Sequence, residues 1–270
     1  MQTGKRIVVK VGTSTLTYET GKLNLRRIEQ LVRTLADLEG RGNEIILVTS
    51  GAIASGQARM NLEKRPSDLK TKQAIAAIGQ SRLIHIYDQF FAEYDYAIGQ
   101  ILLTDEDVDD PKRADHLSNT FSTLLDMKVI PVVNENDSVS SAEIETGKHK
   151  VLGDNDTLSA IVARLCRADA LIILSDIDGL YDADPRHDPD AKLLHEVREI
   201  DETIISMAGG AGSARGTGGM MTKLSAARIC MKAGIDMYIV NGSDINNIYD
   251  LMDGKQVGTL FKGEKNDGCK

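Results

Sequence analysis

Residues 216–223 combine three glycines and a lysine in a pattern suited to binding phosphate. They read Gly-Thr-Gly-Gly-Met-Met-Thr-Lys, and a helical pattern follows from Lys223. Glycine lets the backbone approach a ligand closely, and the first turn of a helix offers free N–H groups and a partial positive charge. The segment is not a P-loop, because Leu224 follows the lysine where that motif requires serine or threonine. A glycine-rich surface loop before a helix is the alternative interpretation.

A second lysine interrupts an apolar run near the N-terminus. The run 7–11 is rich in β-branched residues, which is typical of a strand buried on both faces, and Lys10 lies where it opens into a Gly-Thr-Ser turn at 12–14. A lysine at a strand end can simply extend into water. Ligands of open α/β sheets, however, bind at the carboxyl ends of strands. Lys10 and Lys223 therefore favour two charges directed at one phosphate chain.

Two polar clusters follow other apolar runs and are candidates for binding a second substrate. Ser50 and Gly51 follow the run 44–49, where a hydroxyl and free backbone N–H groups can bind an anion. A serine that caps a helix is an equally good interpretation. Residues 134–138 (Asn-Glu-Asn-Asp-Ser) follow the run 129–133 and form either a polar turn or a site for an ammonium group.

Two further clusters carry more acids than local structure requires. Residues 153–157 read Gly-Asp-Asn-Asp-Thr before a helical pattern, and one acid would suffice to cap that helix. A carboxylate between two catalytic lysines would fix their positions and keep them charged. Residues 174–181 (Leu-Ser-Asp-Ile-Asp-Gly-Leu-Tyr) form a plain turn or face a nucleotide, and they lack the remaining ligands of an EF-hand loop.

The composition narrows the class of protein. The chain has 270 residues, 41% of them hydrophobic, and a net charge of −8, which argues against nucleic-acid and anionic-membrane partners. No apolar run approaches the roughly 18 residues of a membrane span, and no signal peptide pattern is seen. Neither the three cysteines nor the five histidines have the spacing of a metal site. Because the cysteine spacing also matches no redox pattern, we expect a protein of the reducing cytoplasm. The acidic run 105–110 is expected to be a solvated loop.

Apolar runs alternate with helical patterns along the whole chain. Strands are expected at 7–11, 44–49, 97–103, 129–133, 170–174, 237–240 and 258–261, and helices at 25–39, 69–94, 114–127, 155–166, 223–233 and 245–252. This alternation predicts an α/β fold with a mainly parallel sheet covered on both faces. Region 135–152 fits least and is expected to hold a hairpin over the substrate. No linker divides the chain, so a single domain 1–270 is expected, with a substrate lobe at about 1–165 and a nucleotide lobe at about 166–270.

Six motifs occur in order along the chain. They are Val-Val-Lys-Val-Gly-Thr-Ser (8–14), Val-Thr-Ser-Gly-Ala-Ile (48–53), Lys-Gln-Ala-Ile-Ala-Ala-Ile-Gly-Gln (72–80), Asn-Glu-Asn-Asp (134–137), Gly-Asp-Asn-Asp (153–156) and Gly-Thr-Gly-Gly-Met-Met-Thr-Lys (216–223). Together they resemble the amino acid kinase superfamily, and within it the glutamate 5-kinase family. The first and last motifs belong to the wider superfamily. The motifs at 48–53, 134–137 and 153–156 point to the glutamate enzymes.

The resemblance implies an open αβα sandwich that uses ATP and Mg²⁺ to phosphorylate the side-chain carboxylate of L-glutamate, giving L-glutamyl 5-phosphate in the first step of proline biosynthesis. It also implies feedback inhibition by L-proline and a homo-oligomer, either a dimer or a tetramer. A carboxylate is already an anion at neutral pH, so phosphoryl transfer to it needs alignment and positive charge rather than a general base. Mg²⁺ is expected on the ATP phosphates with few protein ligands, so no metal residue is assigned.

The resemblance also assigns roles to individual residues. The catalytic group comprises Lys10, Lys223, Asp154 and Asp156, of which Asp156 would organise the lysines. Glutamate would be bound by Ser50, Gly51, Ala52, Asn134, Asp137 and Asn155. ATP would be bound by Lys10, Gly12, Ser175, Asp176, Gly216, Thr217, Gly218, Gly219, Met220, Met221, Thr222 and Lys223.

The chain departs from the family pattern in two places. Many members carry a C-terminal domain that resembles RNA-binding modules, and this chain ends at Lys270 without it. The stretch 144–152 also looks extended. The alternative functions are another kinase of the superfamily, acting on a different carboxylate, carbamate or nucleoside monophosphate, and a nucleotide-binding regulator without turnover. Retention of both Lys10 and Lys223 argues against the regulator.

Overall fold

An eight-stranded sheet forms the centre of the molecule. The computed structural model describes residues 4–64, 66–139, 154–208 and 217–264. The strands are β1 (Arg6–Val11), β2 (Glu44–Val48), β3 (Ile98–Leu103), β4 (Ile130–Glu135), β5 (Ala170–Ser175), β6 (Glu196–Val197), β7 (Asp236–Asn241) and β8 (Thr259–Phe261). Their order across the sheet is β3-β4-β2-β1-β5-β7-β8-β6. Every pairing is parallel except β7 with β8, which confirms the mainly parallel sheet.

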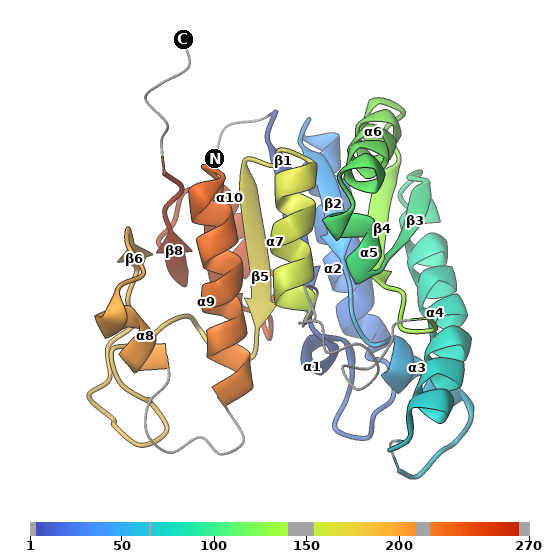
Figure 1. Cartoon of the computed structure of the whole chain (residues 1–270), viewed down its shortest axis with the longest axis horizontal. Helices are drawn as coiled ribbons and strands as arrows, with labels where there is room; N and C mark the ends of the chain where they lie inside the picture. The colour runs from blue at the N-terminus through green and yellow to red at the C-terminus, as the bar shows by residue number, and fades with distance from the viewer. Residues whose placement is uncertain (1–3, 65, 140–153, 209–216, 265–270) are drawn as a thin grey trace.

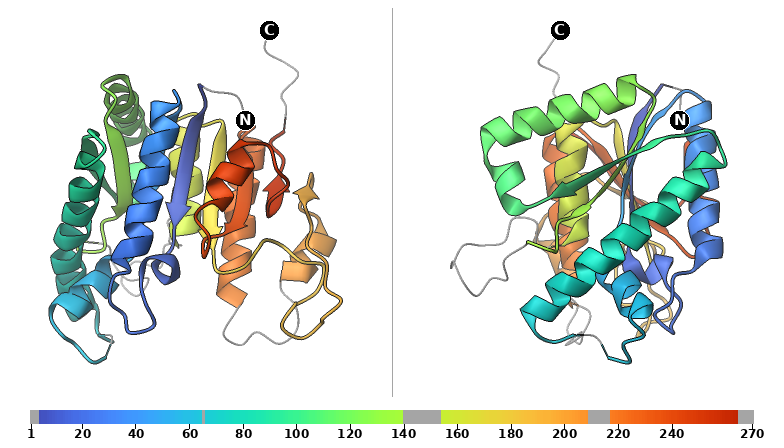
Figure 2. Two further views of the ribbon diagram at one scale, coloured as in Figure 1. Left: turned by 180° about the vertical axis from the view of Figure 1, so that it is seen from behind. Right: turned by 90° about the vertical axis from the view of Figure 1, so that its right-hand side faces the viewer.

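Helices cover both faces of this sheet. They are α1 (Thr13–Leu16), α2 (Leu25–Gly40), α3 (Ala52–Arg59), α4 (Leu69–Ala92), α5 (Asp105–Asp109), α6 (Pro111–Asp126), α7 (Asn155–Leu165), α8 (Glu202–Ala208), α9 (Thr217–Lys232) and α10 (Asn247–Met252). Helices α6, α7 and α9 pack on one face, and α2, α4 and α10 pack on the other (Figures 1 and 2). The expected αβα sandwich is therefore confirmed.

Alternate residues of the central strand enter two separate cores. Val8 of β1 belongs to the core under α6, α7 and α9, whereas Ile7 and Val9 belong to the core under α2, α4 and α10. All three side chains are fully buried. A strand that is covered on both faces has no polar side, which explains why residues 7–9 form an unbroken apolar run and the lysine comes only near the strand end.

The acidic run at 105–110 was expected to be a loop, and that expectation was wrong. Residues Asp105–Asp109 form α5, and the carboxylate of Asp107 accepts from the Thr104 backbone N–H at 2.9 Å. Arg113 donates to the same carboxylate at 2.8 Å and offsets its charge. A Thr-x-x-Asp start of this kind satisfies the free N–H groups of a helix, so the acids favour helix here.

Other differences concern short elements and one boundary. The elements α1, α8 and β6 were not expected, because two to seven residues carry too little periodicity to be recognised. Helix α9 begins at Thr217, not at Lys223 as expected, so the lysine lies in the second turn of the helix. The hairpin expected at 135–152 and the extended stretch at 144–152 fall mostly outside the described residues.

Helices α3 and α4 cross at unusually close range. A Cβ on Gly79 would lie 1.7 Å from the Ala52 carbonyl oxygen, and one on Gly56 would lie 2.0 Å from the Ile75 carbonyl oxygen. Only glycine fits at both positions. The chain enters α3 through Gly51, whose φ of 96° is in the left-handed region that glycine adopts freely. This arrangement fixes the start of α3 beside the end of β2.

Two of the cysteines are core residues. Cys166 follows α7 and Cys230 lies in α9, and burial raises the pKa of each thiol to about 12. Thiols with such pKa values are poor nucleophiles and pack as small apolar groups. Cys269 lies outside the described residues. Among the described helices, none has both the length and the apolar character that crossing a membrane would need.

Candidate active site

The predicted site residues come together at the carboxyl edge of the sheet. Lys10 lies near the end of β1, Ser50 follows β2, Asn134 lies in β4 and Ser175 ends β5. Helix α7 begins at the same edge, where the strand arrows end in the lower part of Figure 1. Because β1 lies between β2 and β5, its carboxyl end has the end of a parallel strand on each side. Clefts of this kind are the usual binding sites of open α/β sheets.

Three buried charged side chains occupy the centre of this edge. Lys10 Nζ lies 2.7 Å from Asp156 Oδ1, and Lys223 Nζ lies 3.1 Å from Asp156 Oδ2. The exposed fractions of Lys10, Asp156 and Lys223 are 8%, 4% and 8%. The sequence expectation that a carboxylate lies between two lysines thus agrees with the geometry.

The charge state of Asp156 follows from two opposing effects. Burial alone would raise the pKa of its carboxyl group, but the positive charges of Lys10 and Lys223 outweigh burial and hold the pKa below its ordinary value. Thr222 adds a further donor, since its hydroxyl lies 3.0 Å from Asp156 Oδ2. The three groups together carry a net charge of +1, a cationic centre in a largely buried position.

Asp154 has a different position from Asp156. Its Oδ1 accepts from the backbone N–H groups of Asp156 and Thr157 at 2.7 and 3.0 Å, which makes it the N-cap of α7. It also lines the cavity beside β1. Its capping bonds fix the first turn of α7 and so place Asp156 between the lysines. Of the two acids in the motif, one caps the helix and the other carries the ion pairs.

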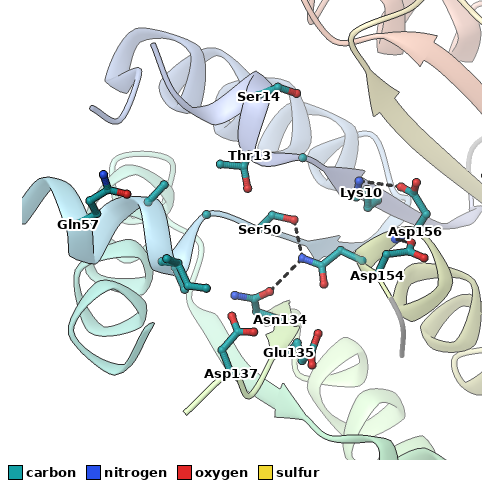
Figure 3. A pocket seen from close by; sticks show the side chains of 16 residues that line it. Lys10, Thr13, Ser14, Ser50, Gln57, Asn134, Glu135, Asp137, Asp154 and Asp156 are labelled. Atoms are coloured by element: carbon teal, nitrogen blue, oxygen red, sulfur yellow. Dashed lines mark hydrogen bonds and ion pairs between the residues drawn. The ribbon is translucent and has the colours of Figure 1, made fainter. Parts of the chain in front are cut away.

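A cavity of about 580 Å³ opens on the Lys10 side of this centre. Its walls include all six residues predicted to bind glutamate, namely Ser50, Gly51, Ala52, Asn134, Asp137 and Asn155. Figure 3 shows Asp137 and Asn134 on one wall, Thr13 opposite, and Lys10 with Asp156 at the inner end. Asn155 Nδ2 joins three parts of the wall, because it donates to Ser50 Oγ, to the Thr49 carbonyl oxygen at 3.1 Å and to Asn134 Oδ1 at 3.3 Å.

A second cavity of about 600 Å³ opens on the Lys223 side. Four residues predicted to bind ATP line it: Ser175, Asp176, Gly219 and Met220, together with Lys223 itself. Lys10 and Gly12 line the first cavity instead. The side chain of Met221 packs against the core. Gly216 lies outside the described residues, and Thr217 and Gly218 are described only as the start of α9.

Sequence reasoning missed part of both cavities. The second cavity has apolar walls from Leu180, Tyr181, Pro185 and Met207, and Arg186 lines it as well. Leu180 and Tyr181 belong to the cluster 174–181, for which a nucleotide was one interpretation. Pro185, Arg186 and Met207 lie further along the loop after β5 and in α8, which the periodicity did not reveal. Ala183 and Asp184, which precede Pro185 in the same loop, also form part of this wall. In the first cavity Thr13, Ser14, Gln57 and Glu135 were missed, and all except Gln57 lie in motifs that had been recognised.

Asp156 connects the two cavities. It lines the first cavity, and its ion pair with Lys223 reaches the lining of the second. A phosphate chain that entered from the second cavity and a carboxylate bound in the first would therefore meet beside the same cationic centre. This arrangement matches the needs of phosphoryl transfer, namely alignment of two ligands and positive charge between them.

Comparison with known proteins agrees with this geometry. The profile of the amino acid kinase family matches residues 5–241. The chain belongs to the amino acid kinase family. Glutamate 5-kinase of Clostridium perfringens (strain 13 / Type A) is 51% identical over 267 residues, covering 99% of this chain and 98% of that protein. Glutamate 5-kinase of Clostridium tetani (strain Massachusetts / E88) is 54% identical over 261 residues, covering 97% and 96%.

A solved structure of an amino acid kinase fold is similar over almost the entire chain. UMP kinase from Ureaplasma parvum superposes with a TM-score of 0.64 at 13% identity and covers 96% of this chain and 99% of that one. At this identity the similarity concerns the fold alone. The sheet and its two helical layers are thus shared with that structure.

Proposed function

We propose that this chain transfers the γ-phosphoryl group of ATP to the side-chain carboxylate of L-glutamate, giving L-glutamyl 5-phosphate in the first step of proline biosynthesis. The observation that carries the proposal is the Lys10–Asp156–Lys223 centre at the junction of two cavities. Relatives about half identical over nearly the whole chain are glutamate 5-kinases. The site therefore belongs to a phosphotransferase with a carboxyl group as acceptor.

The lysines act by charge. Lys10, on the glutamate side, lowers the repulsion between the attacking carboxylate and the phosphate oxygens. Lys223, on the ATP side, stabilises the negative charge that develops on the leaving phosphate. Asp156 holds both ammonium groups at fixed distances, 2.7 Å for Lys10 and 3.1 Å for Lys223. No residue has to remove a proton, because the acceptor is ionised at neutral pH.

The other end of glutamate fits the outer part of the first cavity. Asp137 offers a carboxylate to the α-ammonium group, and Asn155 offers its Oδ1, which has no hydrogen-bond donor among the residues that the structure describes. Ser50 and the backbone N–H groups at the start of α3 suit a carboxylate. Glutamate would lie with its side chain toward Lys10.

The second cavity suits ATP. Its apolar walls can hold an adenine ring, and the first turns of α9 with Lys223 can hold phosphates. The described residues contain no group of three or more His, Cys, Asp or Glu side chains placed to bind a metal. Mg²⁺ would be bound mainly by phosphate oxygens and water, where it would neutralise charge on the transferred group.

The two cavities also support a division of the chain into lobes. Residues that line the first cavity run from Lys10 to Asp156, and those that line the second run from Ser175 to Lys223. We therefore assign about 1–165 to the glutamate lobe and about 166–270 to the ATP lobe. L-Proline would inhibit by occupying the α-carboxylate and ammonium contacts of the first cavity. We also propose a homo-oligomer, for which the exposed Met60, Leu62 and Ile78 offer apolar surface.

ADP release measured with different acceptors tests the proposal. Turnover that depends on L-glutamate, and not on carbamate or a nucleoside monophosphate, is the expected result. Turnover with one of those other acceptors would assign the chain a different kinase activity. ATP binding without turnover on any acceptor would make it a nucleotide-binding regulator. Light scattering after size exclusion gives the oligomeric state.

A further inference from the structure

The motif at 72–80 belongs to the family resemblance, yet none of its residues was assigned to the site. It lies within α4, and its last residue, Gln80, is half-buried. We propose that Gln80 is a positioning residue for glutamate recognition, which acts by fixing the amide orientations of Asn134 and Asn155. This inference rests on the proposed function, because it concerns how the first cavity binds its amino acid.

A chain of hydrogen bonds leads from α4 into the first cavity. Asn134 Nδ2 donates to Gln80 Oε1 at 2.8 Å. Asn134 Oδ1 then faces the cavity side and accepts from Asn155 Nδ2 at 3.3 Å. The same Nδ2 of Asn155 donates to the Thr49 carbonyl oxygen at 3.1 Å. Gln80 is thus the outermost member of a sequence of side chains that reaches the wall of the glutamate cavity.

The direction of this chain matters because each amide has a donor side and an acceptor side. If Asn134 were reversed, its NH₂ group would face the NH₂ group of Asn155. If Asn155 turned as well, its oxygen would face the carbonyl oxygen of Thr49. The Thr49 carbonyl oxygen, which can only accept, and the acceptor on Gln80 at the other end of the chain together favour the one arrangement in which Asn155 Oδ1 is left to accept from an ammonium group in the cavity.

Glycine at position 79 explains how α4 comes close enough for this contact. A Cβ at Gly79 would lie 1.7 Å from the Ala52 carbonyl oxygen, so α4 lies directly against the start of α3. Further along α4, the buried hydroxyl of Tyr87 lies 2.8 Å from Thr49 Oγ1. Polar groups of α4 thus contact the ends of both β2 and β4, the two strands that present Ser50 and Asn134.

Replacement of Gln80 by methionine tests the proposal, since methionine keeps the length of the side chain and removes the acceptor. We expect the KM for glutamate to rise about tenfold, the scale of one lost hydrogen bond, while the KM for ATP and kcat change less than about threefold. Gln80→Glu keeps an acceptor toward Asn134 and should stay within about threefold of the parent. A third cavity, separate from the two described above, is lined by both Gln80 and Gln100. Gln100→Met is therefore a matched control.

A double-mutant cycle with Asn134→Ala separates positioning from a general effect on packing. In the Asn134→Ala background, Gln80→Met should raise the KM for glutamate by less than about twofold, because its partner is already absent. Additive effects in the cycle, or equal losses for ATP and glutamate, would overturn the inference. So would a glutamate KM in Gln80→Met that matches the parent. If the parent itself shows no turnover that depends on glutamate, the proposed function fails and the inference with it.

Discussion

Asp156 is the residue on which the site depends most. It is 4% exposed and holds two lysines by ion pairs of 2.7 and 3.1 Å. A buried charge is stable only when it is paired, so the three residues depend on one another. In the proposed reaction, ammonium groups fixed in this way need no reorganisation when negative charge develops.

Loss of either lysine should strongly lower kcat and leave the protein folded. Both are buried, so methionine is the suitable replacement, since it fills the volume that alanine would leave empty. We expect Lys10→Met and Lys223→Met each to lower kcat by about 10²–10³, the scale of one lost contact to transition-state charge. Lys232→Met, which changes an exposed lysine in the same helix as Lys223, is the control. A kcat within about threefold of the parent would remove that lysine from the reaction.

Asp137 should determine the affinity for glutamate and leave ATP binding unchanged. Asp137→Asn keeps the shape of the side chain and removes the charge that would face the ammonium group. Steady-state kinetics should show a strongly raised KM for glutamate and a nearly unchanged KM for ATP. A raised KM for ATP instead would mean that the two lobes have been assigned in the wrong order.

At the scale of elements, the crossing of α3 and α4 links packing to the site. Gly79→Ala would force a methyl group onto the Ala52 carbonyl oxygen. We expect the free energy of unfolding to fall by about 3 kcal/mol and the KM for glutamate to rise, because α3 begins at the cavity wall. Thermal unfolding and kinetics measure the two effects. Gly40→Ala is the control, since its Cβ would meet only the Tyr96 hydroxyl at 3.4 Å, and a similar loss there would point to a general effect of substitution.

Helix α2 offers a prediction about pH. Burial raises the pKa of Glu39, although the Ile45 backbone N–H, which donates to it at 2.9 Å, opposes the rise. A carboxyl group with a raised folded pKa contributes its stability below the unfolded pKa of about 4.5 and loses it as the pH rises through the folded value. The Tm of Glu39→Gln relative to the parent should therefore increase between about pH 4 and pH 7. A difference in Tm that stays constant across this range would show that ionisation of Glu39 does not destabilise the folded state.

At the scale of the whole molecule, ligands that bind only the folded state should stabilise it. L-Proline at one hundred times its Kd should add about 2.7 kcal/mol of stability, which a thermal shift detects. Asp137→Asn should abolish this shift together with glutamate affinity, and D-proline is the control for stereochemistry. Inhibition that glutamate cannot relieve, and that persists in Asp137→Asn, would place proline at a separate site.

The periodicity and the six motifs were enough to establish the fold class and to select the charged residues. Lys10 and Asp156 are 146 positions apart in the sequence, yet their atoms are 2.7 Å apart because β1 ends and α7 begins at the same edge of the sheet. Parallel strands place their carboxyl ends together, and this rule made the gathering of motifs predictable. Long, strongly periodic segments also have few competing structures, which is why the main strands and helices agreed with expectation.

Burial, orientation and close contact were decided only by the tertiary structure. The local pattern around Asp154 and Asp156 does not say which acid caps α7 and which pairs with the lysines, because both suit either role. Only the family resemblance assigned Asp156 to the lysines, and the ion pairs agree with it. It also does not say that Gln80 reaches Asn134, since that contact depends on the crossing of α3 and α4 at Gly79. Such outcomes depend on distances between elements remote in sequence. Local patterns carry no information about these distances until the sheet and its helices have packed.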